Sequence, residues 1–183
     1  MARLPYLTKA DLTPEDQDVL DREINLNRIL AHSPKAARAF GRLGGFIRFQ
    51  SKLDPRLREL AILQVGYLAR SPYEYSHHIK LGREFGVGDD DIRAIAAETA
   101  GHATSLEPLA RAVLAAARQL TSGLTVSDDT FAELSAALGD ELLLDLIMTI
   151  SFYNGVVRLL GAVEMDVEPE YLHYLEEFPL APA

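Results

Sequence analysis

Apolar residues recur along most of the chain at the three- and four-residue spacing of an amphipathic helix. No window alternates convincingly between apolar and polar positions, as a half-buried strand would. Helix starts are marked by a capping residue followed by proline at the first helical position, where the missing N–H costs nothing. Such starts occur at Thr13-Pro14, Ser33-Pro34, Asp54-Pro55 and Ser71-Pro72, with a weaker example at Glu107-Pro108. The pattern predicts an all-α fold.

About eight helices are expected in one domain that spans residues 1–183. Ser127 supplies a further cap, and Gly139 opens the last long segment. The proline-containing ends, 1–12 and 165–183, are expected to form extended arms. The expected helices are 14–31, 34–51, 55–69, 72–86, 89–100, 107–122, 128–138 and 140–162.

The segment 55–69 differs from the other predicted helices because it is apolar on nearly every face from Leu60 to Ala69. Such a helix must be surrounded by other helices or by a partner subunit. The segment Leu142–Leu160 is also rich in aliphatic residues. Together the two segments predict a homo-oligomer with a buried apolar interface.

Charge and length limit the partners. The net charge of −9 argues against a nucleic-acid partner, because nucleic-acid binding requires a basic surface that neutralises phosphates. No apolar stretch is expected to reach the roughly 20 residues that span a bilayer, and the N-terminus has no apolar signal region. We therefore expect a cytoplasmic protein without a membrane partner.

The chain contains no cysteine. This absence excludes disulfides, thiolate metal sites and every mechanism that uses a cysteine nucleophile.

Glu59 is the first candidate for chemistry. Its neighbours on the same helical face are Ile62, Leu63 and Gly66, so its carboxylate is expected to be partly desolvated. Desolvation raises a carboxyl pKa toward the range that is useful for proton transfer. The alternative is a solvated glutamate in the first turn that stabilises the helix dipole.

The next helix carries two histidines with different expected environments. His78 shares a face with Glu74 and Phe85, so we expect it to point toward the core and to act as an acid or base. His77 is expected to point toward solvent. Ser71 and Glu74 also fit a capping box, in which the serine hydroxyl and the glutamate carboxylate satisfy amides at the helix start. Capping is the interpretation we favour for Ser71, whereas Glu74 is equally suited to contacting His78.

The spacing Glu59-x11-Ser71-x2-Glu74-x3-His78 resembles the signature E-x11-C-x2-C-x3-H of the carboxymuconolactone decarboxylase and alkylhydroperoxidase D-like (AhpD-like) superfamily. The resemblance covers roughly residues 33–165. It extends to the segments around the motif and to the late apolar helix, at 54–63, 73–78, 85–87 and 146–160.

The resemblance implies an all-helical subunit in a homo-oligomer, commonly a trimer or hexamer, with active sites near subunit contacts. In the peroxidase branch, the glutamate and histidine activate a Cys-x-x-Cys pair. Ser71 and Glu74 occupy those two positions here, and a serine hydroxyl forms neither a sulfenic acid nor a disulfide. The chain therefore resembles the branch without cysteine, to which the decarboxylases belong and in which a glutamate precedes the histidine by four residues.

The decarboxylases of this family remove CO₂ from a small acidic lactone, and no cofactor is implied. Such a reaction needs a cation for the substrate carboxylate and a proton donor for the dienolate that forms. The resemblance implies that His78 gives the proton and that Glu59 either orients His78 or relays the proton. Candidate substrate-binding residues are Tyr153, Asn154, Arg158 and Ser71, with Arg42 and Arg48 as further arginines in apolar surroundings.

Three other functions remain open. The first is another proton transfer on a small carbonyl compound, and the second is a non-catalytic oligomeric binding module. The third is a metal site formed by Glu59, Glu74 and His78. Our central expectation is that Glu59 and His78 lie within hydrogen-bond reach, in a pocket lined by apolar residues from 46–68 and 149–158.

Overall fold

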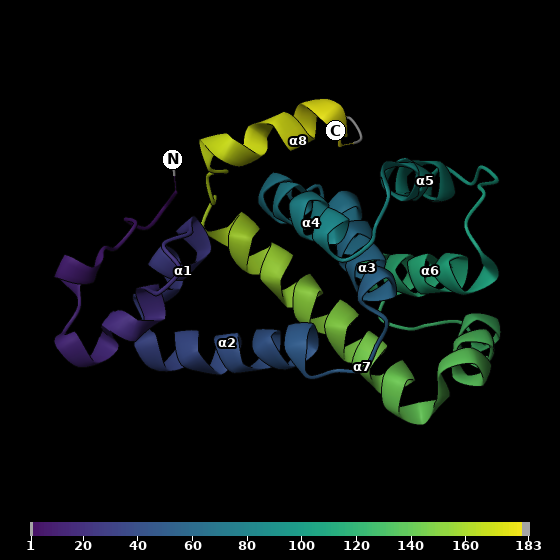
Figure 1. Ribbon diagram of the computed structural model, residues 1–183, viewed down its shortest axis with the longest axis horizontal. Coiled ribbons are helices and arrows are strands. Elements are labelled where there is room, and N and C mark those ends of the chain that lie inside the picture. Colours follow the sequence, from purple (N-terminus) through teal and green to yellow (C-terminus); the bar gives the residue numbers. More distant parts are fainter. Residues whose placement is uncertain (1, 181–183) are drawn as a thin grey trace.

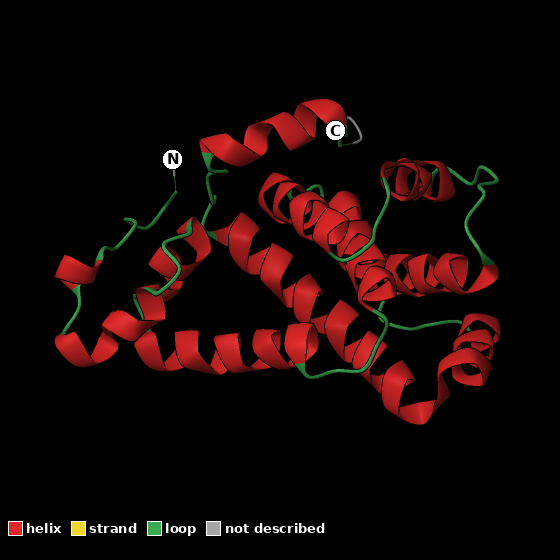
Figure 2. Ribbon diagram, viewed as in Figure 1, coloured by secondary structure: helices red, strands yellow, loops and turns green. Residues whose placement is uncertain are grey.

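The computed structural model describes residues 2–180, and the regular structure in that range is entirely helical (Figures 1 and 2). The all-α prediction is confirmed. The α-helices are α1 (Asn25–Leu30), α2 (Pro34–Phe49), α3 (Pro55–Leu68), α4 (Pro72–Glu84), α5 (Asp89–Thr99), α6 (Pro108–Ser122), α7 (Asp128–Ala162) and α8 (Leu172–Glu177). Short 3-10 helices occur at η1 (Lys9–Asp11), η2 (Pro14–Leu20) and η3 (Pro169–Tyr171).

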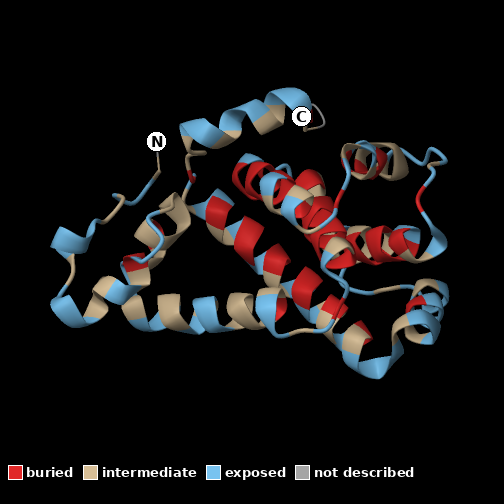
Figure 3. Ribbon diagram, viewed as in Figure 1, coloured by how far each residue is buried: buried red, intermediate tan, exposed pale blue. Residues whose placement is uncertain are grey.

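Helix α3 is the centre of the molecule. Every residue from Leu57 to Tyr67 is buried, and α4, α5, α6 and α7 all pack against it (Figure 3). Full burial of one aliphatic side chain contributes about 1.5–3 kcal/mol, and Leu60 and Leu63 are both completely buried. The apolar segment is therefore a core helix that other helices of the same chain surround, which is one of the two alternatives its composition predicts.

Helices α3 and α4 approach each other closely at Gly66. A Cβ atom at this position would lie 3.3 Å from the backbone nitrogen of Tyr75, a tighter contact than a side chain normally makes. Glycine removes this obstacle, so the chain turns back at 69–71 and α4 runs along α3. Side chains from the two helices, including Glu59 and His78, are thereby brought together.

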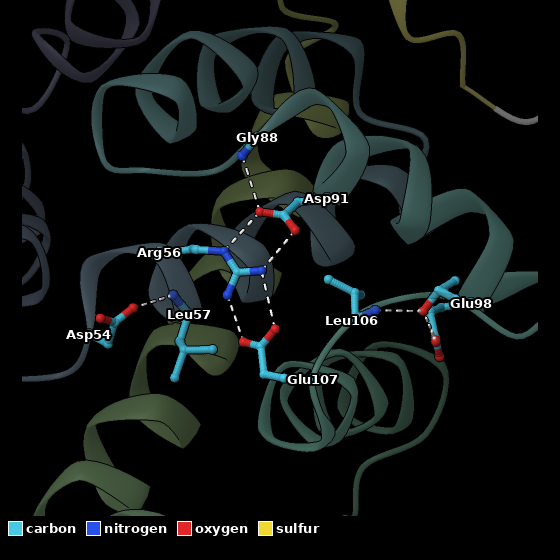
Figure 4. Close-up of polar contacts among 9 residues, drawn as sticks. Asp54, Arg56, Leu57, Gly88, Asp91, Glu98, Leu106 and Glu107 are labelled. Carbon is cyan, nitrogen blue, oxygen red and sulfur yellow. Dashed lines mark hydrogen bonds and ion pairs between the residues drawn. The ribbon is translucent and has the colours of Figure 1, made fainter.

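Polar contacts fix the start of α3 (Figure 4). The side chain of Asp54 accepts a hydrogen bond from the amide of Leu57 at 3.0 Å, as expected for an N-cap. Arg56 forms ion pairs with Asp91 at 2.7 Å and with Glu107 at 2.6 Å. These bonds tie the first turn of α3 to α5 and to the residue that precedes α6.

The expected single helix at 14–31 is wrong. The chain forms η2 there, then leaves helical geometry, and resumes as the short helix α1. The break coincides with tertiary bonds, because the amide of Asn25 donates to Glu168 at 2.7 Å and its side chain donates to the carbonyl of Asp166 at 3.0 Å. These contacts come from residues about 140 positions away, which local spacing cannot indicate.

The C-terminal arm is not simply extended. Within 165–180 the chain forms η3 and α8 and lies over α4 (Figure 1). Phe178 is buried, and Arg83 of α4 forms an ion pair with Glu177 at 2.6 Å. Positions 1 and 181–183 of the two expected arms lie outside the described residues.

Helix α7 contains an 18-residue window that is long and apolar enough to cross a membrane, contrary to our expectation that no such stretch exists. The apolar composition of α7 is accounted for by its packing against other helices of the chain. Gly139 breaks the helix with φ 70° and ψ 172°, and the following part packs its apolar face on α3 and α6. The predicted boundary between 128–138 and 140–162 coincides with this break.

Candidate functional site

His78 and Glu59 form the centre of the site. The Nδ1 atom of His78 lies 2.7 Å from Oε2 of Glu59, within hydrogen-bond distance. Both side chains are buried, since Glu59 has no exposed surface and His78 is 5% exposed. The expected contact between the two residues is confirmed, and the alternative of a solvated Glu59 is wrong.

Glu74 lies on the opposite side of the imidazole. The Nε2 atom of His78 is 3.0 Å from Oε1 of Glu74, which is an ion-pair distance, although the direction is poor for a hydrogen bond. Glu74 therefore faces His78 and not the start of its own helix. Ser71 occupies the N-cap position but makes no capping hydrogen bond through its side chain, so the expected capping box is not formed.

Arg58 completes the charged group, and sequence reasoning missed it. Its Nε atom donates to Oε1 of Glu59 at 3.0 Å, and its Nη1 atom donates to the carbonyl of Arg48 at 3.1 Å. The guanidinium lies 4.6 Å from the ring centre of Phe85 and is almost fully buried. The only sequence signal was an arginine beside a glutamate at the start of an apolar helix.

These contacts determine the charge on His78. Burial alone lowers its pKa, but the negative charges of Glu59 and Glu74 more than offset burial and raise the pKa of His78 to about 9. Burial raises the pKa of Glu59, yet the positive charges of His78 and Arg58 outweigh that effect and hold it below its usual value. At neutral pH the site therefore contains an imidazolium next to an ionised Glu59.

A cavity of about 270 Å³ opens beside His78, between α2, α4, α7 and the chain that precedes α1. Glu74 and His78 form its reactive wall, whereas Phe40 and Phe152 provide apolar surface. The expected lining was partly right, because 46–68 contributes only from the end of α2 and no residue of α3 reaches the cavity.

Tyr153 lies where the prediction placed it, in the cavity wall. Its ring meets that of His78 edge to face with centres 5.0 Å apart. Burial raises the pKa of Tyr153, and the charges of Glu74 and Glu59 raise it further, whereas Arg48 opposes them. The phenol therefore stays protonated and offers the cavity a neutral hydrogen-bond donor.

Three other predicted binding residues are not brought to this cavity. Ser71 lies at the turn before α4, away from the lining. The side-chain Nδ2 atom of Asn154 donates to the hydroxyl oxygen of Thr121 at 3.0 Å. The guanidinium of Arg158 donates to the side-chain oxygen of Asn154 at 2.9 Å. Asn154 and Arg158 therefore bond each other outside the cavity.

Of the three arginines considered, Arg48 lines the cavity, whereas Arg42 and Arg158 do not. Arg22, which precedes α1, lines the cavity as well and was not predicted. Its position depends on the break in the expected helix at 14–31. Local periodicity gave no indication of that break.

His77 is buried, and the expectation that it faces solvent is wrong. The ring is stacked between Tyr73 at 4.0 Å and Tyr171 at 3.7 Å, measured between ring centres. Its Nε2 atom lies 3.3 Å from Glu168, and its Nδ1 atom lies 2.8 Å from the carbonyl of Tyr73. The C-terminal segment covers this helix face, and its approach is not visible in the periodicity of α4.

No group of three or more histidine, aspartate and glutamate side chains within residues 2–180 has the arrangement of a metal site. At the predicted triad, both ring nitrogens of His78 face carboxyl groups. The ring is therefore placed to hold protons between Glu59 and Glu74.

Comparisons with known proteins agree with the fold. No functionally curated protein matches the sequence. An uncharacterized peroxidase-related protein from Ralstonia eutropha JMP134, with an alkylhydroperoxidase AhpD core, is 18% identical with a TM-score of 0.79, over 98% of both chains. A peroxidase-related protein from Silicibacter sp. TM1040 is also 18% identical, with a TM-score of 0.77 over 93% of both chains.

The debrominase Bmp8, in a cysteine-to-alanine variant bound to 2,3,4-tribromopyrrole, is 19% identical with a TM-score of 0.78 over 94% of this chain and 95% of that one. Residues 34–119, which include Glu59, Glu74 and His78, match the carboxymuconolactone decarboxylase family. The chain thus carries a carboxymuconolactone decarboxylase family region within an AhpD-like fold, and it has no cysteine.

Proposed function

We propose that this chain is a carboxymuconolactone decarboxylase-like enzyme that uses glutamate and histidine as acid and base on a small carboxylated lactone or related carbonyl compound. The observation that carries the proposal is the buried imidazole ring of His78, held between two carboxyl groups at the wall of a cavity. Two arginines, Arg22 and Arg48, line the same cavity and suit a negatively charged substrate.

The order of groups suggests a route for the proton. Oε1 of Glu74 is buried without a well-directed hydrogen bond, and Glu74 lines the cavity next to His78. In our proposal Glu74 passes the proton of His78 to the substrate, whereas Glu59 and Arg58 lie behind the ring. The charge of Glu59 favours the protonated imidazole and so supports reprotonation from water after each cycle.

For decarboxylation, the arginines hold the substrate carboxylates while the bond between the leaving carboxylate and its carbon breaks. The electron pair of that bond moves into the conjugated carbonyl system and forms a dienolate. CO₂ leaves, and the proton from His78 adds to the dienolate carbon by way of Glu74, which gives the decarboxylated lactone and a neutral His78. Tyr153 donates a hydrogen bond toward the developing oxyanion.

The same arrangement supports proton transfer without loss of CO₂, such as isomerisation. A non-catalytic binding module is the second candidate, since a cavity with two arginines binds anions without any chemistry. The two candidates differ in what His78 does, because a binding module has no use for a proton donor.

Substitution of His78 separates the two. We expect His78→Ala to lower turnover of small carboxylated lactones or β-keto acids by at least ~10²-fold, as is typical when a general acid is lost. His102→Ala is the matched control, because this exposed histidine lies in the loop after α5. A screen in which no such compound is turned over by the wild type, or in which folded His78→Ala retains full activity, contradicts the enzymatic proposal.

A further inference from the structure

A second cavity, of about 290 Å³, adjoins the first one. We call it the outer cavity, and it extends along α4 toward the C-terminal segment. Its additional lining comes from Lys80, Glu84, Phe85 and Tyr171. The two cavities share the lining residues Arg22, Arg48, Phe49, His77 and Leu81.

Three cations that have no carboxylate partner among the described residues line these two cavities. No carboxylate in residues 2–180 lies within ion-pair distance of Arg22, Arg48 or Lys80. This is unexpected in a chain with a net charge of −9, in which other arginines such as Arg56 and Arg83 each contact two carboxylates. Among the lining residues of the outer cavity, Glu84 carries the one carboxylate. The outer cavity therefore has an excess of positive charge.

The walls of the outer cavity are held in place by aromatic contacts. Tyr171 stacks on the buried His77, and the ammonium group of Lys80 lies 5.8 Å from the ring centre of Tyr171. Phe85 is fixed against the guanidinium of the buried Arg58. The contact with the Tyr171 ring places the exposed ammonium group of Lys80 at the wall of the outer cavity.

We propose that the outer cavity is an anion subsite and that the natural substrate is an elongated molecule. Its carbonyl end lies beside His78, and its far end carries a carboxylate or phosphate group that binds next to Lys80, which lines the outer cavity alone. This inference rests on the proposed function for the position of the reactive end. It adds a substrate class, since the first cavity alone would accommodate a single small ring.

Binding measurements test the subsite independently of catalysis. By calorimetry, we would compare hexanoate and octanoate with the dicarboxylates of the same length, adipate and suberate, and with the corresponding ω-phosphonates. At one of these lengths the second anionic group should strengthen binding at least tenfold. Lys80→Met should abolish this gain and leave the binding of the monocarboxylate unchanged. Lys35→Met, at an exposed lysine in the first turn of α2, is the control.

A gain that is confined to the phosphonates supports the subsite and identifies phosphate as its anion. Equal binding of mono- and dianionic ligands at every length overturns the proposal, as does an equal loss in Lys80→Met and Lys35→Met. These binding measurements do not depend on turnover. They therefore test the anion subsite separately from the proposed enzymatic function, which the effect of His78→Ala on turnover tests.

Discussion

The charge on His78 is set by groups from two helices, α3 and α4. Glu59 and Glu74 approach opposite nitrogens of the ring, and Arg58 neutralises the charge that Glu59 would otherwise carry alone into the core. A buried charge is tolerated only when it is paired in this way. The pKa values of His78 and Glu59 therefore depend on each other and on the charged groups around them.

Stability should depend on pH through His78. Its pKa is raised in the folded state from 6.5 to about 9, so the stabilisation is fully present below pH 6.5 and is lost as the pH rises through 9. The shift corresponds to about 3 kcal/mol, since one pKa unit is worth about 1.4 kcal/mol.

Urea unfolding at several pH values measures this effect, with His78→Gln as the reference for all other titrating groups. The wild type should lose more stability than the variant between pH 6.5 and 9.5. Parallel stability curves for the two proteins would show that His78 is not held as a cation.

The spacing of Glu59 and His78, through its resemblance to the family signature, led us to expect the contact that the structure shows. It could not predict Arg58, since consecutive residues on a helix point in different directions and a buried arginine is rare. The environment of His77 was predicted wrongly for a related reason. The segment that covers it begins about 90 residues later.

At the scale of elements, the helix starts were predictable because proline and a capping residue determine them locally. Helices α2, α3 and α4 begin at the prolines that the sequence indicated. Element ends without such signals were less certain, and the region around α1 was predicted wrongly because tertiary bonds from the C-terminal segment interrupt it.

The break in α7 gives a prediction at this scale. Gly139 has φ 70° and ψ 172°, a conformation that other residues adopt only at considerable cost, while a Cβ atom there would meet nothing within 4 Å. Gly139→Ala should therefore lower the free energy of unfolding by about 1–3 kcal/mol through backbone strain alone.

Gly155 offers the matched control, because it lies within regular helix and also has open space around it. Gly155→Ala should raise the free energy of unfolding by about 0.5–1 kcal/mol through lower chain entropy. Both values follow from chemical denaturation. If both substitutions stabilise the protein, the break at Gly139 does not exist in solution.

In the molecule as a whole, large apolar side chains remain exposed on α7 and at the end of α2. Leu144 and Met148 follow each other by one turn on α7 and are 58% and 40% exposed, and Phe49 at the end of α2 is 74% exposed. The apolar residues of α3 were the first reason to expect an oligomer, but the other helices of the chain cover α3. The exposed Leu144 and Met148 of α7 are now the reason to expect an oligomer.

We expect a homo-oligomer, with a trimer or hexamer as the first candidates, and light scattering at low micromolar concentration measures it. The double variant Leu144→Glu and Met148→Glu should dissociate the assembly, because it places charge in an apolar contact. Leu124→Glu, at a 91% exposed position between α6 and α7, should leave the assembly unchanged. A monomeric wild type of 20.2 kDa throughout this range contradicts the prediction.

The protonation state of His78 decides whether this buried ring can act as a proton donor. Heteronuclear NMR of protein with ¹⁵N-labelled histidine distinguishes neutral from cationic rings, and His78→Gln identifies the signal of His78 among the five histidines. We predict that both ring nitrogens of His78 carry protons at pH 7.5, that the ring titrates near pH 9, and that Glu59→Gln lowers this pKa by at least one unit. A His78 ring that is neutral at pH 7.5 and titrates at or below pH 6.5 would contradict the proposed proton donor.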